Sequence, residues 1–193
     1  MADLLESIEI ETGPNPDAAV VWMHGLGADG HDFEPIVPEL GLPATTRIRF
    51  VFPNAPLRPV TINQGHVMRA WYDIRALAGV RREDEAGVRQ SARQIEALVA
   101  RERQRGIAPG RLALAGFSQG GAMALHVGLR YPDRLAGILA LSCYLPLAMA
   151  EQGREQVAAL GYRIEWHQYP IPHSVSAEEI ADVARWLERV LAA

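Results

Sequence analysis

The sequence contains no lysine, so all 19 of its Lys-or-Arg positions are arginine. This absence excludes a Walker-A lysine, a Schiff-base lysine and a Ser-Lys catalytic pair. The single cysteine, Cys143, cannot form an internal disulfide, which excludes a disulfide-stabilised scaffold. No apolar run approaches the roughly 20 residues that a membrane-spanning helix requires. Several enzyme classes are therefore removed before any motif is considered.

An excess of charge of one sign is also lacking. Acidic and basic residues interleave along the chain and sum to −4, which leaves no electrostatic footprint for nucleic acid or an anionic membrane surface. The first residues carry acids where a secretory signal needs a basic flank. We therefore expect a cytoplasmic protein that binds no nucleic acid and does not insert stably into a membrane.

Short apolar, β-branched runs alternate with longer amphipathic segments, which is typical of a mostly parallel sheet with helices on both faces. The length suits one sizeable core, so we expect a single α/β domain over residues 1–193. The predicted strands are Leu5–Ile10, Ala18–Met23, Arg47–Phe52, Arg111–Gly116, Leu135–Leu141 and Tyr162–Tyr169. The predicted helices are Glu85–Arg105, one directly after Ser118, Met149–Leu160, and a last one that begins at the capping sequence Ser176–Glu179.

The strongest catalytic motif is Gly116-Phe117-Ser118-Gln119-Gly120. A Gly-x-Ser-x-Gly pattern arises by chance about 0.05 times in a chain with 17 glycines and 6 serines. Here it follows an apolar run and precedes a helical pattern, which is the strand–turn–helix context of a nucleophile elbow. The flanking glycines allow helix and strand to pack closely around a strained serine. We predict Ser118 as a nucleophile, and the alternative is a bystander serine in a glycine-rich turn.

A second glycine-rich loop, His24-Gly25-Leu26-Gly27, also follows an apolar run. Glycine lets the main chain turn its N–H groups inward, as an oxyanion hole requires. We predict the main-chain amides of Leu26 and Gln119 as the oxyanion donors. His24 itself is expected to anchor the loop rather than to act as a base.

A serine nucleophile needs a base, and His173 is the best-placed histidine. It follows the last predicted strand and precedes the last helix, so it should lie at the carboxyl edge of the sheet. The chain order, serine before histidine, is the order found in folds that present the serine on a nucleophile elbow. The alternative is a solvated loop histidine. The remaining histidines are expected to be structural or surface residues: His24, His31, His66, His126 and His167.

The acid of a Ser-His-acid triad is not evident. It should lie between nucleophile and base in the chain, where Asp133, Glu151, Glu155 and Glu165 are available. Asp133 precedes a predicted strand and so lies at the wrong edge, and Glu155 and Glu165 fall inside predicted elements. Glu151 alone is expected to begin near the site, although compensation of a helix dipole is its more ordinary role.

These residues resemble the carboxylesterase and acyl-protein thioesterase family of α/β-hydrolases, also described as phospholipase/carboxylesterase. The motifs that carry the resemblance are His-Gly-Leu-Gly-Ala-Asp-Gly at 24–30, Phe-Pro-Asn-Ala-Pro at 52–56, Arg-Ala-Trp-Tyr-Asp-Ile at 69–74, Gly-Phe-Ser-Gln-Gly-Gly at 116–121 and Pro-His-Ser at 172–174. The resemblance implies hydrolysis of esters, thioesters or lysophospholipids without a cofactor or metal, often by a homodimer. It implies Ser118 and His173 as nucleophile and base, Leu26 and Gln119 as oxyanion donors, and Trp71 as a neighbour of the acyl pocket.

The chain departs from this family after Leu147. Family members have a further strand and a His-Gly-x-x-Asp-type loop that carries the acid, whereas Leu145-Pro146-Leu147 here runs almost directly into a predicted helix. About 30 residues, including the acid-bearing strand, are absent by this comparison. Either the protein carries an internal deletion, or the printed sequence omits a segment. We favour omission, because loss of an interior strand together with the acid would damage both sheet and activity.

The leading hypothesis is a serine hydrolase that transfers an acyl group to Ser118 and then to water. One alternative is a catalytically impaired acyl-binding or interaction module, since loss of the triad acid costs about 10⁴-fold in related chemistry. A serine peptidase is a further alternative on the same residues.

Overall fold

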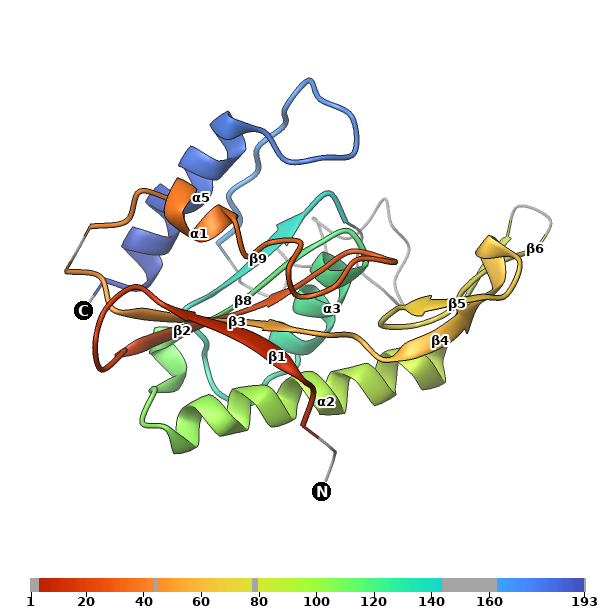
Figure 1. The fold of residues 1–193 in the computed structure, drawn as a ribbon, viewed down its shortest axis with the longest axis horizontal. Helices are drawn as coiled ribbons and strands as arrows, with labels where there is room; N and C mark the ends of the chain where they lie inside the picture. Colours follow the sequence, from red (N-terminus) through yellow and green to blue (C-terminus); the bar gives the residue numbers. More distant parts are fainter. Residues whose placement is uncertain (1–3, 44, 78–79, 144–162, 193) are drawn as a thin grey trace.

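The computed structural model describes residues 4–43, 45–77, 80–143 and 163–192. Its centre is a five-stranded sheet in the order β1-β3-β2-β8-β9 (Figure 1). Strand β1 is antiparallel to β3, and the other neighbours are parallel. The bounds are Ser7–Glu11 for β1, Ala18–Met23 for β2, Ile48–Pro53 for β3, Leu112–Phe117 for β8 and Gly137–Leu141 for β9. The predicted mostly parallel α/β sheet is confirmed, with strand ends that differ by at most two residues.

Helices cover both faces of the sheet, as predicted. Strand β2 is buried along its whole length and directs alternate side chains to opposite faces. Ala19, Val21 and Met23 pack with residues of α2 (Glu85–Gln104) and α3 (Gln119–Gly128). Ala18, Val20 and Trp22 pack with residues of α1 (Ile36–Glu39) and α5 (Ala177–Val190). Figure 1 accordingly shows α2 on one side of the sheet and α1 and α5 on the other.

The two long helices begin and end where their sequences specify. The Asp84 side chain accepts a hydrogen bond from Gly87 N at the start of α2, and the chain leaves that helix through Gly106, whose φ is 96°. At the start of α5 the Ser176 side chain accepts from Glu179 N, at 3.2 Å. These contacts satisfy main-chain groups that a helix end leaves unpaired.

Two small hairpins between β3 and α2 were not predicted. Strands β4 (Leu57–Val60) and β5 (His66–Arg69) pair across the 3-10 helix η1 (Thr61–Asn63). Strands β6 (Ile74–Leu77) and β7 (Val80–Glu83) form the second pair. Both extend to one side of the main sheet in Figure 1. A further 3-10 turn, η2 (Pro109–Arg111), leads into β8.

The predicted strand Tyr162–Tyr169 is wrong over its described part, because residues 163–169 form no strand. This segment is held by side-chain contacts to α5 rather than by main-chain hydrogen bonds to a neighbouring strand. Arg189 Nη2 donates to Glu165 Oε2 at 2.6 Å, and Tyr169 Oη donates to Asp182 Oδ2 at 2.6 Å. The predicted helix Met149–Leu160 lies outside the described residues.

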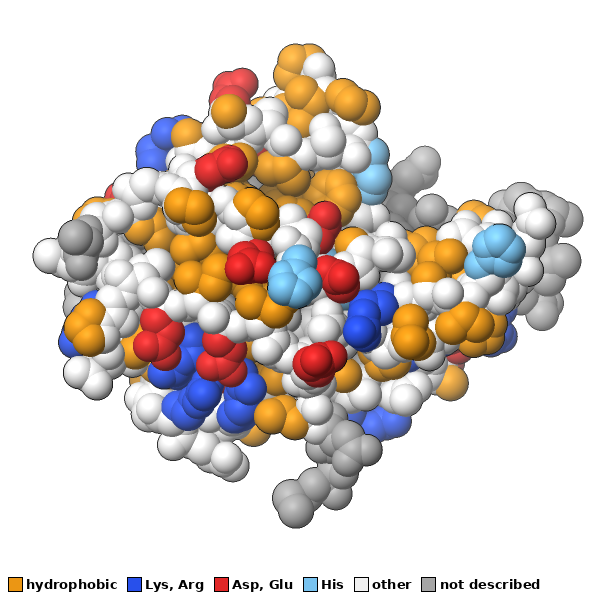
Figure 2. Space-filling model, viewed as in Figure 1, with side chains coloured by type: hydrophobic (Ala, Val, Ile, Leu, Met, Phe, Trp, Pro, Cys, Tyr) orange, Lys and Arg blue, Asp and Glu red, His pale blue; other side chains and the backbone are white. Residues whose placement is uncertain are grey.

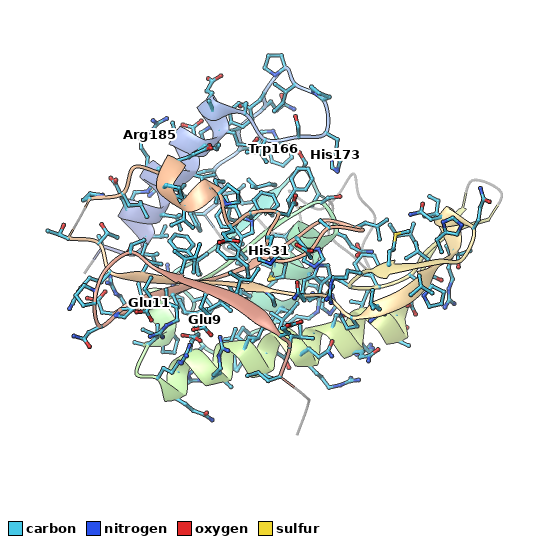
Figure 3. All side chains as sticks on the ribbon, in the orientation of Figure 1. Glu9, Glu11, His31, Trp166, His173 and Arg185 are labelled. Atoms are coloured by element: carbon cyan, nitrogen blue, oxygen red, sulfur yellow. The ribbon has the colours of Figure 1, made fainter. Side chains whose placement is uncertain are left out.

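Charged side chains of both signs interleave on the face drawn in Figure 2, most visibly near Glu9 and Glu11, which Figure 3 labels in the same orientation. Within the described ranges, no helix combines the length and the apolar character needed to cross a bilayer.

Candidate active site

The predicted nucleophile elbow joins β8 to α3 at Ser118. Its backbone has φ 54° and ψ −117°, a conformation that L-residues adopt only under local constraint. The flanking glycines explain how it is tolerated. A Cβ on Gly116 would lie 2.3 Å from the main-chain carbon of Gly120, and a Cβ on Gly120 would lie 2.2 Å from Met23 O. Strand, turn and helix therefore approach at distances that only glycine permits.

His173 lies against this elbow. Its Nε2 is 3.0 Å from Ser118 Oγ, within hydrogen-bond distance. Figure 3 shows the side chain pointing back toward the body of the molecule from the loop that precedes α5. His173 was predicted at this position because it follows the predicted strand Tyr162–Tyr169, but the described residues 163–169 form no strand. The chain order and the following helix were sufficient to give the position.

The predicted oxyanion loop adjoins the same serine. A Cβ on Gly25 would lie 3.6 Å from Ser118 Cβ. Gly27 adopts φ 79° and donates its N–H to Arg69 O at 2.9 Å. The amides of Leu26 and Gln119 donate to no acceptor within the part of the chain that the structure describes. Gln119 is also the first residue of α3, where the helix dipole favours negative charge.

His24 anchors the loop, as predicted. Its Nδ1 lies 2.7 Å from Gly25 O, and its Nε2 accepts from Ala55 N at 3.1 Å. These partners require a neutral ring that carries its proton on Nδ1. Burial lowers the pKa of His24, which favours the same neutral form. Both ring nitrogens are thus occupied, and His24 has no nitrogen to offer Ser118.

Trp71 lies in the core beside the elbow and is completely buried. Its main-chain N–H donates to Gln119 Oε1 at 2.8 Å, and its indole Nε1 donates to His24 O at 2.9 Å. The Gln119 Nε2 group donates to Tyr72 O at 2.8 Å. Sequence reasoning assigned a role only to the Gln119 amide and missed its side chain, which no local pattern identifies. Contact of Trp71 with an acyl group stays a prediction.

No carboxylate contacts His173 within the described ranges. Two of the acids considered above have other partners: Asp133 Oδ2 lies 2.8 Å from Arg103 Nη1, and Glu165 pairs with Arg189. Glu151 and Glu155 lie outside the described residues. The described part of the chain contains no group of three or more His, Cys, Asp or Glu side chains suited to a metal ion.

The chain is similar in sequence to known esterases and thioesterases. A family model described as Phospholipase/Carboxylesterase matches residues 5–162. Acyl-protein thioesterase 1 of Schizosaccharomyces pombe is 42% identical over 148 residues, which cover 77% of this chain and 65% of the relative, a little under two thirds of its length. Acyl-protein thioesterase 1 of Mycosarcoma maydis is 34% identical over 231 residues, covering 96% of each chain. Neither relative supports the alternative of an impaired binding module.

Solved structures show the same fold. The crystal structure of Arabidopsis thaliana SOBER1 superposes with a TM-score of 0.81 at 28% identity, covering 90% of this chain and 99% of that one. Acyl-protein thioesterase 2 of Zea mays gives a TM-score of 0.74 at 22% identity, covering 97% and 99%. The chain therefore has the α/β-hydrolase fold.

The alignments also bear on the predicted gap. The alignment with the Mycosarcoma maydis protein runs over 231 positions, whereas the whole chain has 193 residues. The relative thus contains residues that have no counterpart here, and the position of the gap after Leu147 stays a prediction. The family match ends at residue 162, so His173 lies beyond it.

Proposed function

Because the chain belongs to the phospholipase/carboxylesterase family of α/β-hydrolases, we propose that it hydrolyses carboxylic esters or thioesters through an acyl-enzyme on Ser118. The family and the thioesterase relatives support esterase or thioesterase activity. One observation carries the assignment of the residues: His173 Nε2 lies 3.0 Å from Ser118 Oγ. That distance is within reach for a base that must remove the hydroxyl proton.

The reaction proceeds in two halves. His173 Nε2 accepts the proton of Ser118 Oγ while the oxygen attacks the substrate carbonyl, and the N–H groups of Leu26 and Gln119 receive the oxyanion. His173 then gives the proton to the departing alcohol or thiol, which leaves an ester on Ser118. In the second half His173 deprotonates a water molecule that attacks this ester. The carboxylic acid departs and Ser118 regains its proton.

The substrate class follows from the relatives. Relatives named acyl-protein thioesterase 1 align with this chain, which favours acyl thioesters alongside simple esters. Lysophospholipids remain within the proposal, and Trp71 is proposed to border the acyl pocket.

A serine peptidase would use the same residues, so hydrolysis of a peptide amide and of the matching ester should be compared. We expect turnover of the ester alone.

The test compares p-nitrophenyl butyrate and an S-decanoyl thioester as substrates of the wild type and two variants, Ser118→Ala and His173→Gln. Each change should lower kcat by about 10⁴-fold or more, because a nucleophile and its base act together and the loss of either one removes most of the catalysis. Ser142→Ala is the matched control, because Ser142 also follows a strand of the sheet and also has a positive φ, 47°. Wild-type turnover in Ser118→Ala would overturn the proposal.

A covalent probe locates the acyl-enzyme independently of the substrate. An alkyl fluorophosphonate should add to wild-type protein and to Ser142→Ala once per chain, with the adduct on the peptide that contains Ser118. It should not add to Ser118→Ala. An adduct on any other residue contradicts the nucleophile.

The acid that supports His173 is proposed to lie in the segment absent after Leu147, with Glu151 as the weaker substitute. An intact mass of 21.2 kDa for the natural protein would indicate an internal deletion. A larger mass would indicate a natural chain that contains the additional strand.

Assembly and location complete the proposal. We propose that residues 1–193 form a single domain and that the enzyme acts as a homodimer in the cytoplasm. Size-exclusion chromatography with light scattering tests the dimer, for which a mass of one chain is the contrary result.

A further inference from the structure

The two proposed oxyanion donors come from separate parts of the chain. Leu26 follows β2, and Gln119 begins α3. An oxyanion is stabilised only when both donors lie near 3 Å from the position it will occupy. Some contact must therefore hold the loop after β2 at a constant distance from the amino end of α3.

A third segment, residues 69–72, contacts the helix side of this arrangement. The Gln119 carboxamide accepts from Trp71 N and donates to Tyr72 O, both at 2.8 Å. Gln119 is only 3% exposed, so these two bonds form away from competing water. They fix both ends of a single planar group, and with it the first residue of α3.

The same segment contacts the loop side. Trp71 Nε1 donates to His24 O at 2.9 Å, and Gly27 N donates to Arg69 O at 2.9 Å. These bonds lie on either side of Leu26. Ser91 Oγ on α2 donates to Trp71 O, which ties the segment to the core. The segment thus connects the loop and the helix through four hydrogen bonds.

We propose that the Gln119 carboxamide and the Trp71 indole are positioning groups that hold the Leu26 and Gln119 amides at the spacing an oxyanion requires. The inference rests on the proposed function, since an oxyanion forms only when Ser118 attacks a carbonyl. The two groups act through the donors rather than on the substrate. Their loss therefore weakens binding of the tetrahedral intermediate more than binding of the ground state.

The variants that test this are Gln119→Leu and Trp71→Phe. Gln119→Leu keeps the main-chain N–H and removes both side-chain bonds, whereas Trp71→Phe keeps an aromatic ring and removes the indole N–H. Each should lower kcat by roughly 10- to 100-fold, somewhat less than loss of a donor itself. KM should change by less than about 3-fold. The double variant should lose little more than the worse single variant, because both changes interrupt one connection.

A transition-state analogue separates positioning from general damage. An alkyl trifluoromethyl ketone forms a tetrahedral adduct with an oxyanion, whereas the product carboxylic acid does not. Affinity for the ketone should fall by the same factor as kcat in each variant, and affinity for the acid should stay within about 3-fold. A purely structural role would weaken both ligands together.

Trp22 supplies the matched control. It is 1% exposed, as deeply buried as Trp71, but its Nε1 donates to no acceptor in the described part of the chain. Trp22→Phe therefore makes the same change of side chain without removing a hydrogen bond. It should retain wild-type kcat and ketone affinity.

The decisive comparison is Trp71→Phe against Trp22→Phe, with melting temperatures recorded for both. Equal kcat and equal ketone affinity in the two variants would overturn the proposal. That result would leave the nucleophile untouched, because Ser118→Ala reports on it separately. Should Gln119→Leu fail to fold, Trp71→Phe decides the question alone.

Discussion

The imidazole of His173 packs against the ring of Phe117, with centroids 4.7 Å apart and planes inclined by 36°. The Phe117 ring in turn lies 5.9 Å from the ring of Phe33, which is buried. A row of aromatic rings therefore connects the exposed histidine to the core. This contact matters because no carboxylate among the described residues orients the imidazole.

Replacement of Phe117 should impair the base. In the proposed mechanism His173 becomes an imidazolium when it takes the serine proton, and an aromatic face attracts such a cation by about 0.5–2 kcal/mol. Phe117→Leu should therefore lower kcat/KM by about 10-fold, and Phe117→Tyr, which keeps the ring, should remain near wild type. Steady-state kinetics with p-nitrophenyl butyrate measure both. Equal activity of the leucine and tyrosine variants would mean that the ring contact does not assist the reaction.

Local sequence was sufficient to predict the strands of the main sheet. Strands such as β2 and β8 are continuous apolar runs bounded by turn residues, so their positions follow from composition. The hairpins β4–β5 and β6–β7 are four-residue strands with charged residues and Pro59, and only their pairing makes them strands. The error at residues 163–169 has the same origin, since those residues lack a partner strand in the described structure.

The candidate site likewise has a part that local sequence predicts and a part that it does not. Ser118 and the loop at Leu26 are marked by glycines that the backbone needs locally, and so they can be recognised from sequence. The contacts of Gln119 with Trp71 and Tyr72 join residues far apart in the chain, and no periodicity or spacing encodes them. The ring contact of His173 is likewise a product of the fold.

The elbow should not tolerate a methyl group at Gly120. A Cβ there would lie 2.2 Å from Met23 O and 2.6 Å from His24 O, both main-chain atoms that cannot yield without moving the predicted oxyanion loop. Gly120→Ala should therefore lower the melting temperature and reduce kcat by more than about 10-fold. Gly110→Ala is the control, because nothing lies within 4 Å of its added Cβ. A Gly120→Ala protein as stable and active as Gly110→Ala contradicts this packing.

His126 should make the fold sensitive to acid. Burial, the largest cause, lowers its pKa from 6.5 to about 4, and its Nδ1 has no partner among the described residues. Because the unfolded chain binds the proton more readily, stability rises with pH between about 4 and 6.5 and is lost as the pH falls through that range. Urea unfolding at pH 7 and at pH 4.5 measures the loss.

His126→Leu should reduce this acid sensitivity by about 1–3 kcal/mol. His31→Gln provides a contrast of opposite sign. The ring Nδ1–H of the exposed His31 donates to the Glu34 carboxylate, which raises the pKa of His31, so any stability that this bond adds is present at low pH and lost as the pH rises. An acid response that persists unchanged in His126→Leu would assign the sensitivity to another group.

The last prediction concerns Glu102 on α2, whose side chain is 0% exposed and which contacts three arginines. Its carboxylate lies 2.8 Å from Arg49 Nη1 and 3.0 Å from both Arg101 Nη2 and Arg105 Nη1. Glu102→Gln removes the charge that balances these guanidinium groups and should destabilise the fold by about 3 kcal/mol, since removal of one partner of a buried ion pair leaves the others uncompensated.

Glu85→Gln is the control on the same helix. Its pair with Arg89 is 60–63% exposed at the two side chains, so its loss should cost less than about 0.5 kcal/mol and should depend on salt. Both variants should keep wild-type kcat at temperatures where they are folded. The Glu102 cluster includes Arg49 near the start of β3, whereas Ser118 follows the end of the parallel strand β8. The cluster and the proposed nucleophile therefore lie at opposite ends of the parallel strands. Equal urea midpoints for the two variants would show that the buried carboxylate of Glu102 adds no more stability than the exposed carboxylate of Glu85. A reduced kcat in folded Glu102→Gln would show that the Glu102 cluster and the site at Ser118 are coupled.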